Sequence, residues 1–528
     1  MSDVQQARMP SGIPFIIVNE FAERFCYYGI NSILALYLLQ YLHFGEANAT
    51  TWASFFKSGS YFFPLVGAVV SDVFWGKFRT VLTFSVSYCL GCVVLALARE
   101  PGMIAVGLFL VAFGTGGIKP CVSTNVGDQF TKANEHLIER AFSWFYLAIN
   151  AGSMISIFLC PYLLLRYGPG AAFGMPAVMM FVAVLAFWAG RSKFTVVPPA
   201  GHAWVAEVTS PRGRQTVLRL LSIYAFIAFF WALWDQSNGT TWSLQARSDL
   251  MDKNIGFGIT LLPAQVQLVN AVFILILTPI FSYVLYPFFA RFTTVTPLRK
   301  IGAGLLVTAS SFVIIAWVES RIQAGNVVSI WWQILAYAIL SAGEVLVSIT
   351  GLEYSYKQAP LAMKSFIMAL FLLAVSVGNA FTGVVNQIMI RPLQATQMTV
   401  GAETWVSVAH ADAFVSGQKI DFDGKTGVQV IGADGKAEDL QGTYLVQTVD
   451  AAGGRLRLMD ATTRRPLVSS GHFDAGAAAV STYALVGPVY FLFFAGLLAA
   501  LTVIFVFVAM AVKETVHVRE DAPQGAPA

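Results

Sequence analysis

The chain has 528 residues, of which 56% are hydrophobic and only 12% are charged. Soluble domains carry about twice that share of charged residues, so the composition excludes an ordinary soluble protein and indicates an all-α polytopic membrane protein. The formal net charge of +4 is too small to indicate a nucleic-acid partner. All five cysteines fall in apolar segments, which favours buried free thiols over disulfides or metal ligands.

Hydropathy predicts twelve transmembrane helices, each long enough to cross about 30 Å of hydrocarbon. The expected ranges are 14–42, 52–72, 79–98, 103–126, 141–166, 171–190, 217–240, 263–290, 298–319, 329–356, 362–390 and 484–512. Residues 1–13 lack the basic region of a signal peptide, so we expect the first apolar segment to be retained as a span.

Basic residues alternate from loop to loop, as the positive-inside rule requires. The richer set of loops carries Lys77, Arg79, Lys132, Arg140, Arg191, Lys193, Arg212, Arg214, Arg219, Arg291, Arg299, Lys300, Lys357, Lys364 and Lys513. The other loops carry few basic residues. The pattern therefore predicts that both termini are cytoplasmic, in agreement with an even number of spans.

The spans divide into two sets of six, joined by a basic connection. We expect the following domains: 1–190, an N-terminal six-helix bundle; 191–216, a cytoplasmic linker; 217–390, helices 7 to 11 of the C-terminal bundle; 391–483, an insert; 484–513, helix 12; and 514–528, a cytoplasmic tail. Two six-helix halves with a charged central loop resemble the major facilitator superfamily, whose substrate site lies between the halves.

Residues 391–483 do not fit a membrane, because they are polar and rich in Gly and Asp. Turn signals at Asp423-Gly424 and Asp434-Gly435 and the alternating runs 444–449 and 455–459 predict β-hairpins. The insert lies between helices 11 and 12, which predicts an extracytoplasmic position. It holds no His/Cys cluster and no nucleophile motif, so an accessory role is favoured over a catalytic one.

The first span carries Glu20, Glu23 and Arg24 on one helical face, although each charge in hydrocarbon costs about 2.5–3.5 kcal/mol or more. One alternative is a structural Glu–Arg pair. However, two carboxylates against one guanidinium leave a carboxylate free to titrate. Lys119 in the fourth span is the expected partner, because it lies at a similar depth. A cluster of this kind can couple protonation to a conformational change.

Glu344 lies midway through the tenth span with no basic residue near it in that span. An unpaired acid at this depth either stays protonated or binds a cationic ligand. A zwitterionic ligand would therefore place its ammonium group at Glu344 and its carboxylate at Arg24 and Lys119 on the other half.

Polar and aromatic residues of other spans are expected to complete the binding site. They are Tyr27, Tyr28, Tyr61, Tyr146, Asn150, Trp231 and Asn270. The loop after the second span holds Asp72, Lys77 and Arg79 in a Gly-Lys-x-Arg turn, for which a cytoplasmic gate or hinge is the expected role.

Several motifs resemble the proton-dependent oligopeptide transporter (POT) family. Residues 20–28 read ExxERFxYY, and similar matches are found at 145–153, 230–236 and 344–360. The resemblance implies that Glu20, Glu23, Arg24 and Lys119 serve proton coupling and carboxylate contact. It implies that Glu344 binds the peptide amino group and that Tyr28, Tyr61, Asn150 and Asn270 line the site.

The sequence also departs from that family in four places. Many members have Arg where this chain has Asn31, pairing with an acid at the position of Asp235. We hypothesise that Lys57 takes over as the partner of Asp235 at this gate. Ser54 lies where animal members carry His, and Phe371 lies where many members carry Trp. The linker is too short for the two extra helices that many bacterial members have.

These observations predict a proton-coupled symporter that imports di- and tripeptides by alternating access and functions as a monomer in a bacterial inner membrane. Protons are the coupling ion, and no other cofactor or metal is expected. A relative that carries nitrate or another small anion is the alternative within transport, although Glu344 would repel anions. A receptor, or an enzyme with its active site in the β insert, is the alternative from another class.

Overall fold

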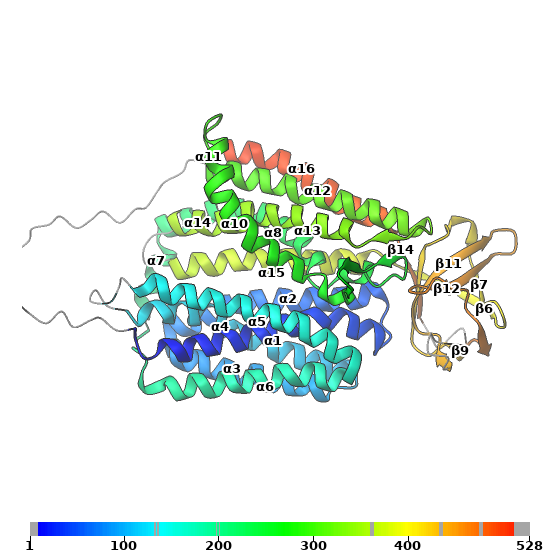
Figure 1. Cartoon of the computed structure of the whole chain (residues 1–528), viewed down its shortest axis with the longest axis horizontal. Coiled ribbons are helices and arrows are strands. Elements are labelled where there is room, and N and C mark those ends of the chain that lie inside the picture. Colours follow the sequence, from blue (N-terminus) through cyan, green and yellow to red (C-terminus); the bar gives the residue numbers. More distant parts are fainter. Residues whose placement is uncertain are drawn as a thin grey trace, which may run out of the picture.

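The computed structural model describes residues 9–130, 134, 137–196, 198–199, 201–358, 364–431, 437–474 and 479–511. It shows a bundle of long helices with a β-domain, residues 390–483, against one end (Figure 1). Helix α1 begins at the opposite end of the bundle, where the short helix α7 also lies. The predicted tail, residues 514–528, lies outside the described residues.

The N-terminal half has six long helices, as predicted. They are α1 (Ile13–Gln40), α2 (Glu46–Val69) with the π-helical η1 (Val70–Trp75), α3 (Lys77–Leu97), α4 (Pro101–Asp128), α5 (Ile138–Tyr167) and α6 (Pro169–Ala189). In this half α1 packs against α5 and α6, and α3 against α4 and α6.

The C-terminal half is more irregular. Its helices are α8 (Pro211–Ser237), α9 (Thr241–Gln245), α10 (Leu268–Ile280), α11 (Tyr286–Phe289), α12 (Pro297–Gln323), α13 (Trp331–Glu344), α14 (Thr350–Gln358), α15 (Lys364–Ile388) and α16 (Pro488–Ala511). The π-helical segments η5 (Phe281–Leu285) and η6 (Val345–Ile349) join α10 to α11 and α13 to α14. A π turn widens the helix locally and is common at functional sites; here η6 follows Glu344 directly.

Ten segments among the described residues are long and apolar enough to span a membrane. The other two predicted spans correspond to α1 and α2, which are equally long but carry charged residues. The total of twelve spans therefore stays a prediction.

The predicted linker, residues 191–216, contains one short helix, α7 (His202–Thr209), in its described part, and α8 begins at Pro211. This start is six residues earlier than the predicted span. Ser210 caps α8 by accepting a hydrogen bond from the Gly213 N–H, and Pro211 at the first position favours the helix start. The described residues show no pair of extra helices.

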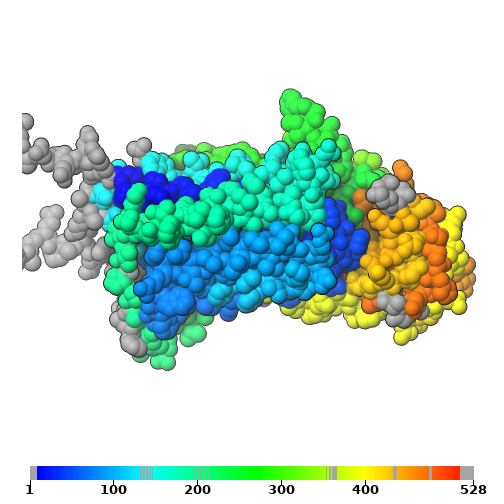
Figure 2. All heavy atoms as spheres, turned by 90° about the horizontal axis from the view of Figure 1, so that it is seen from below, coloured from blue at the N-terminus to red at the C-terminus, as the bar shows by residue number. Residues whose placement is uncertain are grey.

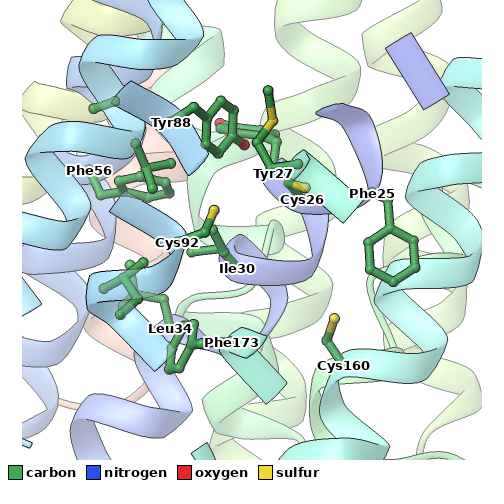
Figure 3. Close-up of a cluster of buried hydrophobic side chains, with 14 of the residues drawn as sticks. Phe25, Cys26, Tyr27, Ile30, Leu34, Phe56, Tyr88, Cys92, Cys160 and Phe173 are labelled. Carbon is green, nitrogen blue, oxygen red and sulfur yellow. The ribbon is translucent and has the colours of Figure 1, made fainter. Parts of the chain in front are cut away.

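Each half has its own hydrophobic core, and the core of the N-terminal half surrounds α1. Figure 3 shows Phe25, Cys26, Tyr27 and Ile30 of α1 among side chains from α2, α3, α5 and α6. All five cysteines are free thiols, four of them buried and Cys89 partly buried, as the sequence predicts.

Small residues let the helices around the predicted site approach closely. A Cβ added at Gly152 of α5 would lie 2.4 Å from the Phe21 carbonyl oxygen on α1. One added at Gly67 of α2 would lie 2.1 Å from the Gly116 carbonyl oxygen on α4. Both distances are shorter than any carbon–oxygen contact, so glycine at these positions brings the helices that carry Arg24 and Lys119 against their neighbours.

The β-domain consists of two antiparallel sheets. Its strands are β5 (Ile390–Leu393), β6 (Ala395–Thr399), β7 (Trp405–Val408), β8 (Lys419–Asp423), β9 (Val428–Ile431), β10 (Ala437–Asp439), β11 (Gly442–Asp450), β12 (Arg455–Asp460), β13 (Ser469–Gly471) and β14 (Ala479–Tyr483). The order is β5-β14-β8-β11-β12-β7-β6 in the larger sheet and β10-β9-β13 in the smaller.

The predicted hairpin of 444–449 and 455–459 is present as the pair β11–β12. The turn signal at Asp423-Gly424 does not make a hairpin, because β8 pairs with β11 and β14 while β9 joins the other sheet. Asp434-Gly435 lies outside the described residues, between the paired strands β9 and β10. The residues at 423–424 therefore indicated a turn, but they could not predict that the next strand, β9, joins the other sheet.

The β-domain holds the start of α2. The Lys419 ammonium lies 2.6 Å from a Glu46 carboxylate oxygen, and the Glu46 N–H donates to Thr443 Oγ1 at 3.0 Å. The Tyr483 hydroxyl and the Asp423 carboxylate accept from the N–H groups of Ala47 and Gly45. In Figure 2 the dark-blue connection between α1 and α2 lies beside the orange β-domain. First-turn N–H groups of α2, which lack partners within the helix, are thus satisfied by another domain.

Candidate functional site

The charged cluster of α1 is buried and internally paired. Arg24 Nε donates to Glu20 Oε1 at 2.6 Å and lies 3.1 Å from Glu23 Oε2. Glu20 is 1% exposed and Glu23 is not exposed at all. Both Glu23 oxygens lack any hydrogen bond among the described residues. A single guanidinium therefore serves two buried carboxylates, as the sequence indicated.

Lys119 does not form the predicted ion pair in this conformation. Its ammonium lies 3.9 Å from the ring centres of both Tyr27 and Tyr61, and it has no hydrogen bond within the described part of the chain. The rings compete with the carboxylates of Glu20 and Glu23 for the ammonium group, because a cation over an aromatic face is attracted by the ring quadrupole. Lys119 remains near the carboxylates, with which it interacts electrostatically, and it is free to bind an incoming anionic group.

Glu344 lies on the C-terminal half and is held only by neutral donors. Its Oε2 accepts from Trp234 Nε1 at 2.8 Å and from Asn270 Nδ2 at 2.9 Å. The Asn270 amide also donates to Ser341 Oγ at 3.0 Å. No Lys, Arg or His among the described residues makes an ion pair with Glu344, and its binding of a cationic ligand stays a prediction.

Two tyrosines of the N-terminal half lie near both Arg24 and Glu344. Tyr28 and Tyr61 are both close enough to Glu344 for an electrostatic interaction, and both also interact with Arg24. Tyr27 lies against them, with ring centres 5.3 Å from Tyr28 and 6.1 Å from Tyr61. Arg24 and Glu344, which have opposite charges and lie on different halves, are therefore near the same two tyrosines.

The remaining predicted lining residues have different surroundings. The Trp231 ring packs edge-on against Trp234, with centres 5.2 Å apart, and its buried Nε1 has no acceptor among the described residues. Asn150 is partly buried in α5 and accepts from Ser153 Oγ through its carbonyl. The Tyr146 side chain lies outside the described residues.

The structure brings Lys57 and Asp235 together as the predicted gate pair. They form a fully buried ion pair between α2 and α8. The Lys57 ammonium also donates to the carbonyls of Asp235 and Asn238, each at 3.0 Å. Ser54 Oγ donates to the second Asp235 oxygen at 2.6 Å, and Asn31 Nδ2 donates to the Asn238 carbonyl at 3.3 Å.

Further hydrogen bonds join the halves on the side nearest the β-domain. Ser376 Oγ donates to the Ser58 carbonyl at 2.8 Å, and Asn386 Nδ2 donates to Thr50 Oγ1 at 3.1 Å. These residues belong to α2 and α15, which pack along their lengths. The halves are therefore closed against each other at the β-domain end.

The loop after the second predicted span, which holds Asp72, Lys77 and Arg79, only partly matches the predicted cytoplasmic gate. Lys77 forms an ion pair with Asp128 of α4, whereas no ion pair of Asp72 or Arg79 is found among the described residues. Gly76 between η1 and α3 adopts a φ of 75°, which favours glycine. The turn thus docks on α4, and its gating role stays a prediction.

Sequence reasoning missed two residues of the site. Trp234 is the closest donor to Glu344, although only Trp231, one turn earlier on the same face, was predicted. Ser54 was noted as a departure, but its bond to Asp235 was not foreseen. Helical spacing could have indicated both. Trp234 is three residues after the predicted Trp231, and Ser54 is three residues before the predicted Lys57.

The described residues contain no group of three or more His, Cys, Asp or Glu that could hold a metal ion. The fold and the site define a polytopic helical membrane protein with two halves and charged groups of opposite sign on them. The chain belongs to the POT family, whose model matches residues 78–210 and 200–406.

Known relatives agree with this assignment. The chain is 37% identical over 361 residues to "Peptide transporter family 1" of Drosophila melanogaster, covering 60% of this chain and 48% of that protein. It therefore spans about half the length of the curated relatives it matches. A crystal structure of the POT family transporter PepTSo is similar with a TM-score of 0.66 and 34% identity, covering 72% of this chain and 90% of that one.

A second crystal structure, of an auto-inhibited POT family peptide transporter, covers 97% of this chain and 99% of its own, with a TM-score of 0.71 and 26% identity.

Proposed function

We propose that this protein is a proton-coupled symporter that imports di- and tripeptides by alternating access. The observation that carries the proposal is the two-ended charge arrangement. Arg24 and Lys119 lie on one half, and Glu344, without a cationic partner in the described chain, lies on the other. A peptide offers a carboxylate and an ammonium group at its two ends, whatever its side chains.

Proton coupling is supported by the surplus carboxylate on α1. Glu20 and Glu23 share the guanidinium of Arg24, so a proton on either one removes a charge that the site cannot otherwise neutralise. A peptide carboxylate that binds Arg24 or Lys119 would compete with these acids and favour their protonation. Binding of substrate and proton would thus support each other.

The same charge pattern disfavours the alternative of a small anion such as nitrate. An anion would meet Arg24 and Lys119, but it would leave Glu344 without a cation. The β-domain, for its part, shows no metal cluster in its described residues that would favour an enzyme.

The orientation follows from the loop charges. We propose twelve spans in a bacterial inner membrane, cytoplasmic termini, an extracytoplasmic β-domain and function as a monomer. On this assignment the contacts between α2 and α15 close the outer side. Protons serve as the coupling ion without another cofactor.

The test is uptake of a radiolabelled dipeptide into liposomes with an imposed pH gradient. Uptake should require an acidic exterior and should be competed by unlabelled di- and tripeptides but not by nitrate. Competition by nitrate, or accumulation without a proton gradient, would contradict the proposal.

A further inference from the structure

A cavity of about 120 Å³ lies where both helical halves meet the β-domain. Its walls come from α2, α9, α12, α15 and α16 of the bundle and from β8, β11, β14 and the β12–β13 loop of the β-domain. The space is large enough for several water molecules. It is separate from the site between Arg24 and Glu344, none of whose residues line it.

Five charged side chains line the cavity, and two of them satisfy each other. Glu46 and Lys419 form the ion pair that docks the β-domain. Glu319 is 9% exposed and accepts one hydrogen bond, from Gln245 Nε2 at 2.9 Å. It makes no ion pair with any described residue.

The other two are arginines that form no ion pair with a described residue. Neither Arg247 nor Arg464 makes a side-chain hydrogen bond within the described chain, and the Arg464 Nε is buried without an acceptor. Burial lowers the pKa of both groups. The carboxylates of Asp460, Glu46 and Asp249 offset this only partly at Arg247, as does that of Glu319 at Arg464. A buried guanidinium donor without an acceptor, as at Arg464, is costly, so an anionic group that enters the cavity would gain by binding it.

The loop that carries Arg464 is fixed in place. Arg464 has a φ of 55°, a left-handed conformation that is uncommon for a residue other than glycine. Its N–H donates to the Asp460 carbonyl, and the Asp460 carboxylate accepts from the N–H groups of Thr462 and Thr463. The Asp249 N–H donates to the Thr462 carbonyl, which ties this loop to the segment that carries Arg247. Strain of this kind is retained where it positions a functional side chain.

We propose that this cavity is a second binding site for a small zwitterionic peptide, with its carboxylate on Arg247 and Arg464 and its ammonium group on Glu319. Glu319 is within electrostatic range of Arg464 but does not pair with it, which leaves room for a ligand between them. The inference rests on the proposed function only in taking peptides as the molecules that reach this face.

Occupancy would favour the closed outer side. The cavity has walls on both halves, Thr50 on α2 and Asn386 on α15 being joined by a hydrogen bond at its edge. Separating the halves would dismantle the cavity. A ligand that binds only the closed conformation shifts the equilibrium towards it, so external peptide at high concentration should slow its own uptake.

The experiment measures equilibrium binding of labelled Ala-Ala to the full-length protein with the central site disabled by Glu344→Ala. This variant should retain one binding site per chain. Adding Arg464→Gln or Arg247→Gln should weaken that binding about 10- to 100-fold, as expected for losing a charge-assisted hydrogen bond. Arg465→Gln is the matched control, since Arg465 is the exposed neighbour and does not line the cavity.

Ligand analogues distinguish the two ends of the peptide. Ala-Ala amide should lose binding through the arginines, and N-acetyl-Ala-Ala should lose binding through Glu319. Equal displacement by inorganic phosphate would show a general anion site and overturn the peptide assignment.

The outcomes separate this inference from the proposed function. If the unmodified protein binds Ala-Ala but Glu344→Ala abolishes all binding, the second site is refuted and the proposed function stands. If the unmodified protein neither binds nor transports Ala-Ala while the cavity binds another anion, both are refuted. Melting temperatures within a few degrees of the Glu344→Ala background confirm that the arginine variants are folded.

Discussion

Two buried charge clusters of this protein differ in how completely they are neutralised. Lys57 and Asp235 pair one to one, and Ser54 and two backbone carbonyls add three hydrogen bonds to the pair. At Arg24, one guanidinium serves two carboxylates, and Lys119 lies against aromatic rings instead of an anion. The first cluster is neutral as it stands, whereas the second gains from a proton or a ligand carboxylate.

The difference in neutralisation indicates a different role for each cluster. A satisfied pair between helices holds one conformation, because breaking it leaves two uncompensated buried charges. An incompletely satisfied cluster responds to binding, because each added charge or proton changes its electrostatic energy. If the proposed function holds, Lys57–Asp235 closes one end of the bundle and the cluster on α1 responds to proton and substrate.

The largest expected effect follows from removing the surplus carboxylate. Glu20→Gln or Glu23→Gln should abolish accumulation of dipeptide driven by a pH gradient, because the remaining carboxylate then pairs one to one with Arg24 and no surplus acid is left to titrate. The measurement is uptake into liposomes with and without the gradient. Exchange of labelled for unlabelled dipeptide at equal pH, which needs no net proton movement, should persist as the control. Full accumulation in either variant would refute the coupling role.

Breaking the satisfied pair should have the next largest effect. Lys57→Ala or Asp235→Ala alone leaves a buried charge unpaired and should cost about 3–5 kcal/mol, while the double variant should cost less than the sum. A double-mutant cycle measures the effect. Thermal unfolding and dipeptide uptake are compared for the unmodified protein, the two single variants and the double variant. Additive losses would show that the two residues do not act as a pair.

Glu344→Gln should weaken binding of free dipeptides about 10- to 100-fold, since a charge-assisted hydrogen bond to the peptide ammonium is lost. Binding of N-acetylated dipeptides, which have no ammonium group, should change little. Glutamine keeps an oxygen that can accept from Trp234 and Asn270, so the packing should be preserved. An equal loss for both ligands would argue against contact with the amino group.

The smallest expected effect concerns the junction of the β-domain. Burial raises the pKa of Asp421 to about 8; the nearby carboxylates of Glu46 and Asp423 act in the same direction, and the Thr443 hydrogen bond and Lys419 act against them. The folded state thus prefers the protonated acid. Its contribution to stability is complete below the ordinary pKa near 4 and is lost as the pH rises through about 8.

Asp421→Asn should remove this dependence. Its melting temperature should match that of the unmodified protein near pH 4 and exceed it by a few degrees above pH 8. Asp450→Asn is the control on the same domain, because Asp450 is exposed and its pKa is lowered by Arg455. A constant difference between Asp421→Asn and the unmodified protein at all pH values would contradict the assignment.

The sequence was informative wherever one helix carried the signal. The face formed by Glu20, Glu23 and Arg24 could be predicted because the helical repeat alone places them together. The same holds for Glu344, whose apolar neighbours in its own span showed that it lacks a local partner. The β11–β12 hairpin was equally local.

Contacts between elements were less predictable. Depth matching placed Lys119 near Glu20 and Glu23, but the rings of Tyr27 and Tyr61 decided where its ammonium rests. The pairing of Lys57 with Asp235 was a hypothesis based on a missing arginine, and the structure supports it. Trp234 could not be chosen over Trp231, because both lie on one helical face and only the rotation of α8 against α13 distinguishes them.

The sequence by itself indicated a polytopic membrane protein and the charged residues of its helices, because hydrocarbon tolerates few polar groups and makes each one conspicuous. Only the tertiary structure decided which charges are satisfied. Neutralisation depends on distances of a few ångströms between helices far apart in the chain, as between Ser54 and Asp235. The tertiary structure also placed the β-domain against both halves, around a cavity lined by two arginines that form no ion pair with a described residue. The sequence of the strands had given no indication of a binding site there.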